Sequence, residues 1–577
     1  MSMRTLVGEC LVEGEAAGQL MRSDLALSFM GGVDPATGRV TDVHHPLHGQ
    51  CVAGKVLAIP SGRGSCSGSL VMFELLMNGH APRALILEHK ETILTLGVVI
   101  ALELFARGIP VVRLPSEAFA ALTGASYARV EGATIEITDT LASAEAVAHL
   151  AEIELGSFLL TPHDRRFLAG ELGEAARLAM RIVIRAARLE GADSLVDVDM
   201  AHIDGCFYQG PASLQFARKL RDLGGKVRVP STMNAICVDR RRWRDQGVAE
   251  GLGRASDELA ECYVAMGVKP TYTCAPYLID PAPAFGQQIA WAESNAVMFA
   301  NSVLGARTMK YPDYLDMLVA ITGRAPNADS HRPERRLATL RVDVDPPRDP
   351  DDAFWPLLGY HLGKVATNEI PVVCGLEGMV ATHDDLKAFG AAFATTSAAP
   401  MFHILGITPE AATLRDAAGP AGPARHVAVT RDDLRATWRE LSTASDPAVD
   451  LVALGNPHFS LSECSALARL CAGRKKVAHV ALIVTCGRDV YAQAEAAGYV
   501  DSIRAFGGQF LNDTCWCFIA EPVVAREARC IATNSGKYAH YGPAAVGKGF
   551  HFASLASCVE AACTGAIDTA LPGWLAA

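Results

Sequence analysis

Residues 55–114 contain, in order, the runs KVLAIP (55–60), SGSLVMFELLMNG (67–79), ALILEH (84–89), TLGVVIALELFARG (95–108) and IPVVRL (109–114). The short apolar runs are typical of buried strands and the longer ones of helices, so this stretch predicts β-α-β-α-β with a parallel sheet. The preceding segment (31–50) is rich in Gly, Pro and Asp and predicts turns in the same domain. Together they indicate a small α/β domain of roughly 130 to 140 residues.

The rest of the chain predicts a larger α/β body. Thr161 followed by Pro162 is a typical helix start, and helical spacing continues through FLAGELGEAARLAMRIVIRAARLEG (167–191). Beyond it, strand-like and helical runs alternate toward the C-terminus, which favours a doubly wound, multi-lobed arrangement. Ahead of it, the run LASAEAVAHLAEIE (141–154) has a helical Ala/Glu pattern and is expected to connect the domains. We therefore expect a small domain (1–135), a linker (136–157) and a large domain (158–577).

Composition and charge exclude several classes of protein. Half of the 577 residues are hydrophobic and 20% are charged, which excludes disorder, collagen and coiled coil. The chain has 52 basic and 63 acidic residues, a formal charge of −11. That is the wrong sign for a protein that neutralises phosphates along nucleic acid. We expect no nucleic-acid partner.

Neither export nor membrane insertion is expected. Glu9 and Glu13 interrupt the apolar stretch that a secretory signal needs. The longest apolar run, Thr92 to Ala106, contains Glu103 and is shorter than the roughly 20 residues of a membrane-spanning helix. We expect a cytoplasmic chain, in which the 16 cysteines are thiols or metal ligands rather than disulfides.

The first candidate for chemistry is the turn IPSGRGSCSGS (59–69), where a predicted strand gives way to a helix. A helix N-terminus stabilises negative charge, so the hydroxyl of Ser65 would have its alkoxide form stabilised there. The turn matches neither a Walker loop nor a dinucleotide fingerprint. An ordinary Gly/Ser-rich turn explains the same residues, so both interpretations stay open.

Cysteines in loop-like contexts are the second candidate. They are Cys237 in STMNAIC, Cys274 in TYTCAPY, and Cys515 and Cys517 in NDTCWC. Thiolates from separate loops hold iron–sulfur clusters, and a cluster iron without full protein ligation can act as a Lewis acid. No CxxC occurs, so spacing gives no support for zinc. Each cysteine could equally be a buried, inert side chain.

Four polar segments form the third candidate: AHIDGCFYQG (201–210), AESNAVMFANSVLGARTMK (292–310), GNPHFSLSEC (455–464) and ATNSGKYAHY (532–541). Arg and Lys beside Asn and Ser in loops suit a carboxylate ligand. Each side chain could instead cap a helix or form an ion pair. Together the segments carry more polar loop chemistry than a scaffold requires.

The same segments resemble the aconitase X family. PSGRGSCSGS followed by VMFELLMNGHAPRALILEH resembles that family's small swivelling domain, in which a Gly-x-Gly-Ser turn supplies the active-site serine. AHIDGCFY, VPSTMNAICVD, TYTCAPYL, FGQQIAWAESNAVMFANSVLGART, GNPHFSL, NDTCWC and ATNSGKYAHY resemble the large domain in order. The resemblance runs from about Ser23 to the C-terminus and implies a swivelling α/β domain fused to a multi-lobed aconitase-like body.

The fused arrangement is similar to the bacterial single-chain form of the family, a cis-3-hydroxy-L-proline dehydratase. The two-subunit archaeal form is a mevalonate 5-phosphate dehydratase. The archaeal pattern has Cys-Pro-His where this chain has Asn456-Pro457-His458. The resemblance implies iron–sulfur ligands at Cys274 and Cys515, and we assign Cys237 as the third. A 2Fe-2S cluster, similar to that of the single-chain branch, is favoured.

By this resemblance the chain is a hydro-lyase. It would convert cis-3-hydroxy-L-proline to Δ1-pyrroline-2-carboxylate by removing the α-proton and losing the 3-hydroxyl. Ser65 would be the base and His202 a second proton-transfer group. Substrate binding is assigned to Ser67, Asn301, Ser302, Arg307, Asn534, Ser535 and Lys537. The partner is then a small hydroxy amino acid, with no separate protein subunit required.

Three alternatives remain. A phosphorylated hydroxy acid, as in mevalonate 5-phosphate, would need several cations, and only Arg63 lies near the Ser65 turn. An iron–sulfur sensor or RNA-binding regulator is disfavoured by the charge of −11 and by the lack of a basic stripe. A cluster-free enzyme, in which all 16 cysteines are structural, would show no iron–sulfur absorbance.

Overall fold

The chain folds into two units. A computed structural model describes residues 4–43, 45–139, 144–153 and 155–576. The first unit comprises Met1–Ser231, Glu261–Val268 and Tyr311–Ala328, and the second comprises Thr232–Ala260, Lys269–Lys310 and Asp329–Ala577.

The first unit contains the β-α-β-α-β segment that the opening runs predict. Its strands are β3 (Val56–Ile59), β4 (Ala84–Leu87) and β5 (Val111–Arg113), and its helices are α1 (Gly68–Asn78) and α2 (Ile93–Phe105). The three strands are parallel, which confirms the prediction. The long strand β2 (Glu9–Arg22) pairs with β3 and also with β5, so these four strands close on themselves.

Four further strands extend this sheet: β1 (Arg4–Val7), β6 (Tyr127–Glu131), β7 (Thr134–Thr138) and β8 (Ala144–His149). The last one corrects a prediction. Residues 144–149, expected to be helical, pair antiparallel with β2. Local Ala/Glu propensity favours a helix, but hydrogen bonding to the long neighbouring strand overrides it. Residues 141–143 and 154 of the same run lie outside the described residues.

The predicted helix start at Thr161 is confirmed. Its side chain accepts a hydrogen bond from the Asp164 backbone, and the Asp164 side chain accepts one from Thr161, a capping box. The helix does not run on as expected, however. It divides into α4 (Pro162–Leu168) and α5 (Glu174–Leu189), because Gly170 and Gly173 take φ values of 78° and 103° between them.

The remaining elements of the first unit are α3 (Ser116–Ala120), β9 (Leu195–Asp197), β10 (Ala201–Ile203), α6 (Pro211–Asp222), α9 (Leu315–Thr322) and β13 (Arg324–Pro326). Of these, α9 and β13 pack against α5. Next along the chain are β11 (Ser231–Met233) and α7 (Glu250–Ala265), whose residues are divided between the two units. The second unit also contains β12 (Ala290–Trp291), α8 (Ser294–Met298) and a π-helical turn (Phe299–Leu304).

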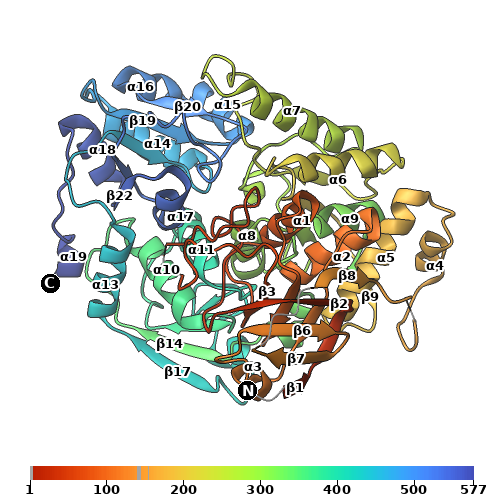
Figure 1. Ribbon diagram of the computed structural model, residues 1–577. Helices are drawn as coiled ribbons and strands as arrows, with labels where there is room; N and C mark the ends of the chain where they lie inside the picture. Colours follow the sequence, from red (N-terminus) through yellow and green to blue (C-terminus); the bar gives the residue numbers. More distant parts are fainter. Residues whose placement is uncertain (1–3, 44, 140–143, 154, 577) are drawn as a thin grey trace. The chain divides into compact units, whose positions relative to one another are not determined.

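The second unit contains two parallel sheets. The first has the order β16-β15-β14-β17, from β14 (Leu340–Val344), β15 (Pro371–Cys374), β16 (His403–Ile404) and β17 (Arg425–Val429). Its helices are α10 (Phe354–Ala366), α11 (His383–Thr396), α12 (Leu414–Ala418) and α13 (Arg431–Leu441). Figure 1 shows α10 and α13 beside β14 and β17, and Phe354, Phe389 and Phe393 fill the core between helices and sheet.

The second sheet has the order β20-β19-β18-β21-β22. Its strands are β18 (Leu451–Leu454), β19 (Ala481–Thr485), β20 (Gln509–Leu511), β21 (Cys530–Thr533) and β22 (Gly549–Phe552). Its helices are α14 (Leu461–Cys471), α15 (Arg488–Ala496), α16 (Tyr499–Phe506), α17 (Gly536–Val546) and α18 (Leu555–Thr564), before a final α19 (Gly573–Ala576). The chain starts at central β18 and winds outward in both directions, so the expected doubly wound body is confirmed.

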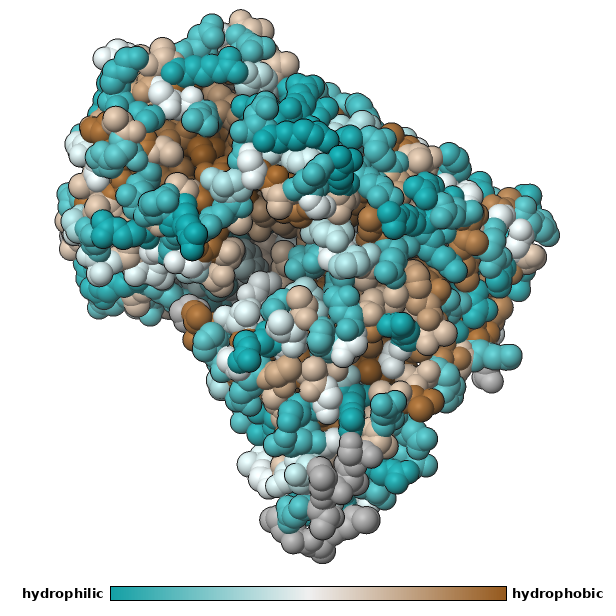
Figure 2. Space-filling model, turned by 45° about the horizontal axis from the view of Figure 1, so that its top comes forward, coloured by the Kyte–Doolittle hydropathy of each residue, from teal (hydrophilic) through white to brown (hydrophobic). Residues whose placement is uncertain are grey.

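Among the described residues, no helix is both long enough and apolar enough to cross a bilayer. On the face drawn in Figure 2, hydrophilic residues cover most of the surface and apolar residues are interspersed among them.

Candidate active site

Four of the predicted site residues follow strands of the C-terminal sheet: Cys515 follows β20, and Asn534, Ser535 and Lys537 follow β21. Asn456 and His458, from one of the polar segments, follow β18, and Arg488, which the sequence did not single out, follows β19. Because these strands are parallel, their carboxyl ends meet at one edge. Ligands of doubly wound sheets bind at this edge, next to the point where the strand order reverses.

Three thiols gather beside this edge. Cys274 and Cys515 are 2% and 3% exposed and pack with Ala235, and Cys517 and Phe518 join the same cluster. A hydrogen bond to Cys274, together with burial, raises the pKa of Cys515 well above its ordinary value. Cys517, in the motif NDTCWC, belongs to this cluster, although the sequence analysis did not assign it as an iron–sulfur ligand. Cys237 is not among the packed members of this cluster in the described chain.

Cys237 nevertheless belongs to a segment bound to the Cys515 loop. The preceding residue, Ile236, donates its backbone N–H to the carbonyl of Asp513 at 2.7 Å and bridges Thr514. Cys237 itself is partly buried. Its assignment as third ligand stays a prediction, with Cys517 as the competing thiol.

His458 joins the two cysteine loops. Its Nε2 donates to the carbonyl of Thr514 at 2.7 Å, and its Nδ1 accepts from the hydroxyl of Thr273 at 3.0 Å. Its backbone N–H donates to the sulfur of Cys274 at 3.3 Å. Burial lowers the pKa of His458 to about 4, so the ring is neutral at pH 7. A neutral ring suits this arrangement because one nitrogen must accept and the other donate.

Lys537 places a buried positive charge beside the thiols. Its Nζ donates to Glu293 at 2.8 Å, and Glu293 also accepts hydrogen bonds from Asn295 and Asn234. Burial alone would raise the pKa of Glu293, but the charge and hydrogen bond of Lys537 outweigh it and lower that pKa to about 2. The charges of Glu293 and of the cysteines raise the pKa of Lys537 against the effect of burial. Both groups are therefore ionised at pH 7.

A small cavity of about 20 Å³ lies between β18 and β21, where the strand order reverses. Its lining includes Lys387, Asn456, Glu463, Asn534 and Ser535. Burial raises the pKa of Glu463 to about 7 although Lys387 pairs with it. The Oδ1 atom of Asn456 is buried without a partner in the described structure, while its Nδ2 donates to Cys517 at 3.4 Å.

This cavity adjoins the start of α17. The Ser535 hydroxyl caps that helix by accepting from the backbone of Tyr538 at 3.0 Å. The free backbone N–H groups of a first helical turn favour an anion. Two of the predicted substrate-binding residues, Asn534 and Ser535, thus line one polar cavity.

The segment around Asn301 is engaged by the protein itself. Asn301 donates to the carbonyls of Thr308 and Pro400 and accepts from Arg336. The hydroxyl of Ser302 accepts from the backbone of Phe402 at 2.9 Å. Both side chains thus hold the π-helical turn in place, and their contact with substrate stays a prediction.

Arg307 differs from these neighbours. Its Nε is buried and has no hydrogen-bond partner among the described residues, so a donor remains for a ligand.

Ser65, Ser67 and His202 belong to the first unit, whereas all other predicted site residues belong to the second. Ser65 is partly exposed at the turn before α1, where its hydroxyl donates to Ser67 Oγ and accepts from the Ser67 backbone, both at 3.2 Å. Ser67 is buried at the N-cap position of α1. His202 is fully buried in β10.

Comparison with known proteins decides the family. Models of four aconitase X domains match the chain: the swivel domain at residues 5–138, the first domain at 157–334, the second at 338–439 and the third at 449–564. The chain belongs to the aconitase X family. The resemblance inferred from the sequence is confirmed, including the N-terminal swivel domain. The division of the chain at residues 135 and 157 stays a prediction.

Two aconitase X relatives match over almost their whole length. The cis-3-hydroxy-L-proline dehydratase of Hypocrea jecorina is 52% identical, covering 98% of this chain and 97% of the relative. The enzyme of the same name from Pseudomonas aeruginosa is 50% identical, covering 99% and 98%. The crystal structure of Thermococcus kodakaraensis aconitase X in its holo-form has a TM-score of 0.63 and 32% identity, covering 70% of this chain and all of that one.

The aconitase X family suggests an iron–sulfur cofactor, and the side chains at the site fit one in their chemistry. Among the described residues, no three His, Cys, Asp or Glu side chains are arranged as a finished metal site. Cys274, Cys515 and Cys517 nevertheless bring soft sulfur donors together from two loops. Buried polar atoms without partners in the described chain, Thr514 Oγ1 and the Tyr538 hydroxyl, occur on the flanking segments.

Proposed function

We propose that this chain dehydrates cis-3-hydroxy-L-proline to Δ1-pyrroline-2-carboxylate. The observation that carries the proposal is the identity of 50% or more to two dehydratases of that substrate over nearly the entire chain. In this reaction the α-proton leaves to a base, and its C–H electron pair forms the C2=C3 bond. The C3–O bond breaks and the hydroxyl leaves as water, and the resulting enamine tautomerises to the cyclic imine.

Such a reaction needs three functions from the protein. A positioned base must take the α-proton, an acid must protonate the departing hydroxide, and cations or amides must hold the carboxylate. We assign the base to Ser65, whose hydroxyl lies at the helix-terminal turn and forms hydrogen bonds with Ser67. His202 is assigned as a second proton-transfer group. Closure of the swivel domain over the substrate would exclude water from these groups.

Substrate binding is assigned to the polar residues of the second unit together with Ser67. The first turn of α17, with Asn534, Ser535 and Lys537, suits the carboxylate because it offers backbone donors and a buried cation. The unpartnered Oδ1 of Asn456 suits the ring ammonium, which needs an acceptor. We also assign Arg307 to binding the substrate carboxylate, because its buried Nε–H has no hydrogen-bond partner among the described residues.

The proposal includes an iron–sulfur cluster held by Cys274, Cys515 and a third thiol, with a 2Fe-2S cluster favoured. When bound, such a cluster supplies a Lewis acid for the hydroxyl that departs. Lys537 and Glu293 would keep a positive and a negative charge fixed beside it. The proposal also includes a reducing, cytoplasmic location, where cysteines are expected as thiols or metal ligands rather than disulfides. Fusion of the swivel domain supports activity without a separate subunit.

The test is a paired substrate assay. Anaerobically purified protein with measured iron content is incubated with cis-3-hydroxy-L-proline or with mevalonate 5-phosphate, and pyrroline-2-carboxylate and alkene are followed. Turnover of the hydroxyproline alone supports the proposal. Turnover of the phosphorylated acid alone overturns the substrate assignment within the same enzyme class.

A further inference from the structure

Tyr272 and Asp513, which precede two of the buried cysteines, have unusual backbone conformations. Tyr272 has a φ of +48° and Asp513 a φ of +67°, and each lies two positions ahead of a cysteine, Cys274 and Cys515 respectively. Residues other than glycine are disfavoured in this left-handed region of backbone conformation. Other contacts must therefore hold the backbone there, and the same backbone sets the direction in which each thiol leaves its loop.

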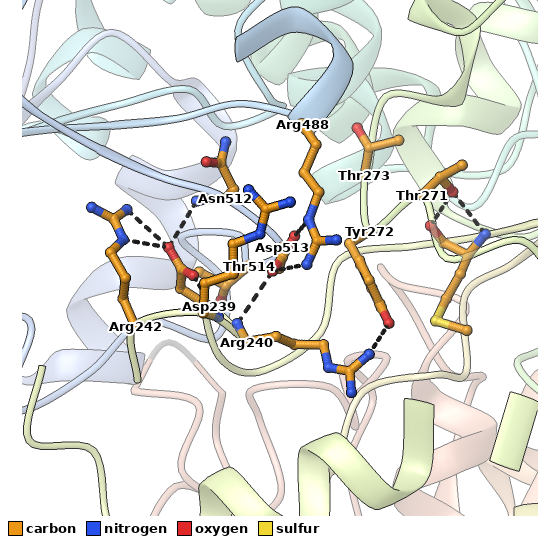
Figure 3. Close-up of polar contacts among 12 residues, drawn as sticks. Asp239, Arg240, Arg242, Thr271, Tyr272, Thr273, Arg488, Asn512, Asp513 and Thr514 are labelled. Carbon is orange, nitrogen blue, oxygen red and sulfur yellow. Dashed lines mark hydrogen bonds and ion pairs between the residues drawn. The ribbon is translucent and has the colours of Figure 1, made fainter. Parts of the chain in front are cut away.

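Arg488 holds both of these residues (Figure 3). Its Nε and Nη2 donate to the two carboxylate oxygens of Asp513 at 2.5 and 2.6 Å. Its guanidinium carbon lies 4.9 Å from the ring centroid of Tyr272. Asp513 is fully buried, so the bidentate pair also compensates a carboxylate that has no access to water. One side chain at the start of α15 thus contacts both cysteine loops.

Arg240 holds the same two residues from a third loop. Its backbone N–H donates to Asp513 Oδ2 at 3.2 Å, and its guanidinium donates to the Tyr272 hydroxyl and lies 5.5 Å from the ring centroid. Its Nε is held by Asp257 at 2.9 Å. Arg240 lies three residues after Cys237, so this contact ties the segment of the third predicted ligand to the other two.

The surrounding contacts keep the three loops in register. Asp239 accepts the backbone N–H of Asn512 at 3.3 Å and pairs with Arg242 (Figure 3). On the other side, Thr271 exchanges hydrogen bonds with the backbone of Met233 at 2.8 and 3.0 Å. These contacts are made by residues that flank the cysteines, so the network acts on the thiols through the backbone of their loops.

We propose that Arg488 and Arg240 are positioning residues that hold Tyr272 and Asp513 in their left-handed conformations and thereby orient Cys274 and Cys515 as a joint donor set for the iron–sulfur cluster. The inference rests on the cofactor part of the proposed function and is independent of the substrate. It predicts that loss of Arg488 loosens the thiol cluster specifically, rather than the second unit as a whole.

The experiment uses the full-length protein, stripped of metal with a chelator and reduced. Wild type, Arg488→Met, and the control Arg474→Met, which removes an exposed ion pair with Glu560 in the same unit, are pulsed with a thiol alkylating reagent and mapped by mass spectrometry. Cys464 and Cys558 serve as internal standards because they are fully buried in a separate core. We expect alkylation of Cys274 and Cys515 to accelerate about 10-fold or more in Arg488→Met, while the internal standards and the control variant keep the wild-type rates.

A rescue variant separates positioning from general stability. Removing Arg488 leaves the buried carboxylate of Asp513 unpaired, so Arg488→Met could unfold the unit. In Arg488→Met/Asp513→Asn the charge is gone, and Asn tolerates a positive φ better than most residues. We expect the free energy of unfolding to return toward wild type, because no unpaired charge is left. Alkylation of Cys274 and Cys515 should stay fast and iron uptake should stay about 10- to 100-fold lower, because the side chain that holds Tyr272 and Asp513 is still absent. Wild-type alkylation and iron uptake in this variant would show that Arg488 only neutralises Asp513, and would overturn the inference.

Two further results would overturn the inference. One is alkylation that accelerates equally at Cys464, Cys558 and the two loop cysteines, which indicates global loosening. The other is an Arg488→Met protein with wild-type alkylation and iron uptake. Neither readout involves substrate, so failure of the dehydratase assignment leaves this test unaffected.

Discussion

The buried pair of Glu293 and Lys537 gives the sharpest quantitative prediction. The side chains of both residues are 11% exposed and their charged atoms lie 2.8 Å apart. A pKa of about 2 for Glu293 against its ordinary 4.5 corresponds to about 3 kcal/mol of stabilisation at neutral pH. Removing one partner of a buried pair costs about 3 to 5 kcal/mol, because the other charge is left uncompensated. We therefore expect Glu293→Gln to destabilise the protein by about 3 kcal/mol.

The assay is a double-mutant cycle by urea unfolding at pH 7, with Glu293→Gln, Lys537→Met and the double variant. The double variant removes both charges and should recover part of the loss, giving a coupling energy of about 2 kcal/mol. Because the pKa of Glu293 is depressed, its stabilisation is fully present above pH 4.5 and is lost as the pH falls toward 2. Additive effects, to within about 0.5 kcal/mol, would refute the reasoning.

Three further outcomes are expected. Ser65→Ala should lower turnover by about 10²- to 10⁴-fold with iron content and melting temperature unchanged, whereas near-normal turnover would reassign Ser65 to capping. Burial raises the pKa of Glu91 to about 7. The free energy of unfolding of the wild type should therefore fall by up to about 3 kcal/mol as the pH rises from 4.5 through 7. Glu91→Gln should lack this loss in urea titrations at pH 5 and 8, and an identical pH dependence in both proteins would contradict the cause. Asn456→Ala should raise KM about 10-fold through a lost hydrogen bond while iron content is retained, and an unchanged KM would remove Asn456 from the substrate site.

The fold could be predicted where a segment's own pattern decides its structure. The apolar runs of 55–114 are short enough for strands or long enough for helices, and Thr161 caps its helix through residues three positions away. The strand at 144–149 could not be predicted, because its partner β2 lies more than a hundred residues earlier. Its Ala/Glu composition favours a helix in isolation, and only the long neighbouring strand makes it extended.

The candidate site residues could be named from the sequence only in part. Cys274, Cys515 and Lys537 could be named as candidates because their motifs are loop-like and because the family resemblance supports them, and their roles stay predictions. The contacts that organise them were not, since Arg240 and Asp513 are 273 positions apart and neither is unusual in its local sequence. Conversely, Asn301 has the polar character of a binding residue, but its amide is engaged by Pro400 and Arg336. Sequence shows which side chains are polar, whereas only the fold shows which protein groups already occupy them.

The most direct test of the central claim is a proton NMR time course of cis-3-hydroxy-L-proline with the iron-containing protein in D₂O. We expect the C2 and C3 proton signals of the substrate to disappear together as Δ1-pyrroline-2-carboxylate appears with deuterium at C3. Persistence of the substrate signals, in a preparation that forms alkene from mevalonate 5-phosphate, would contradict it.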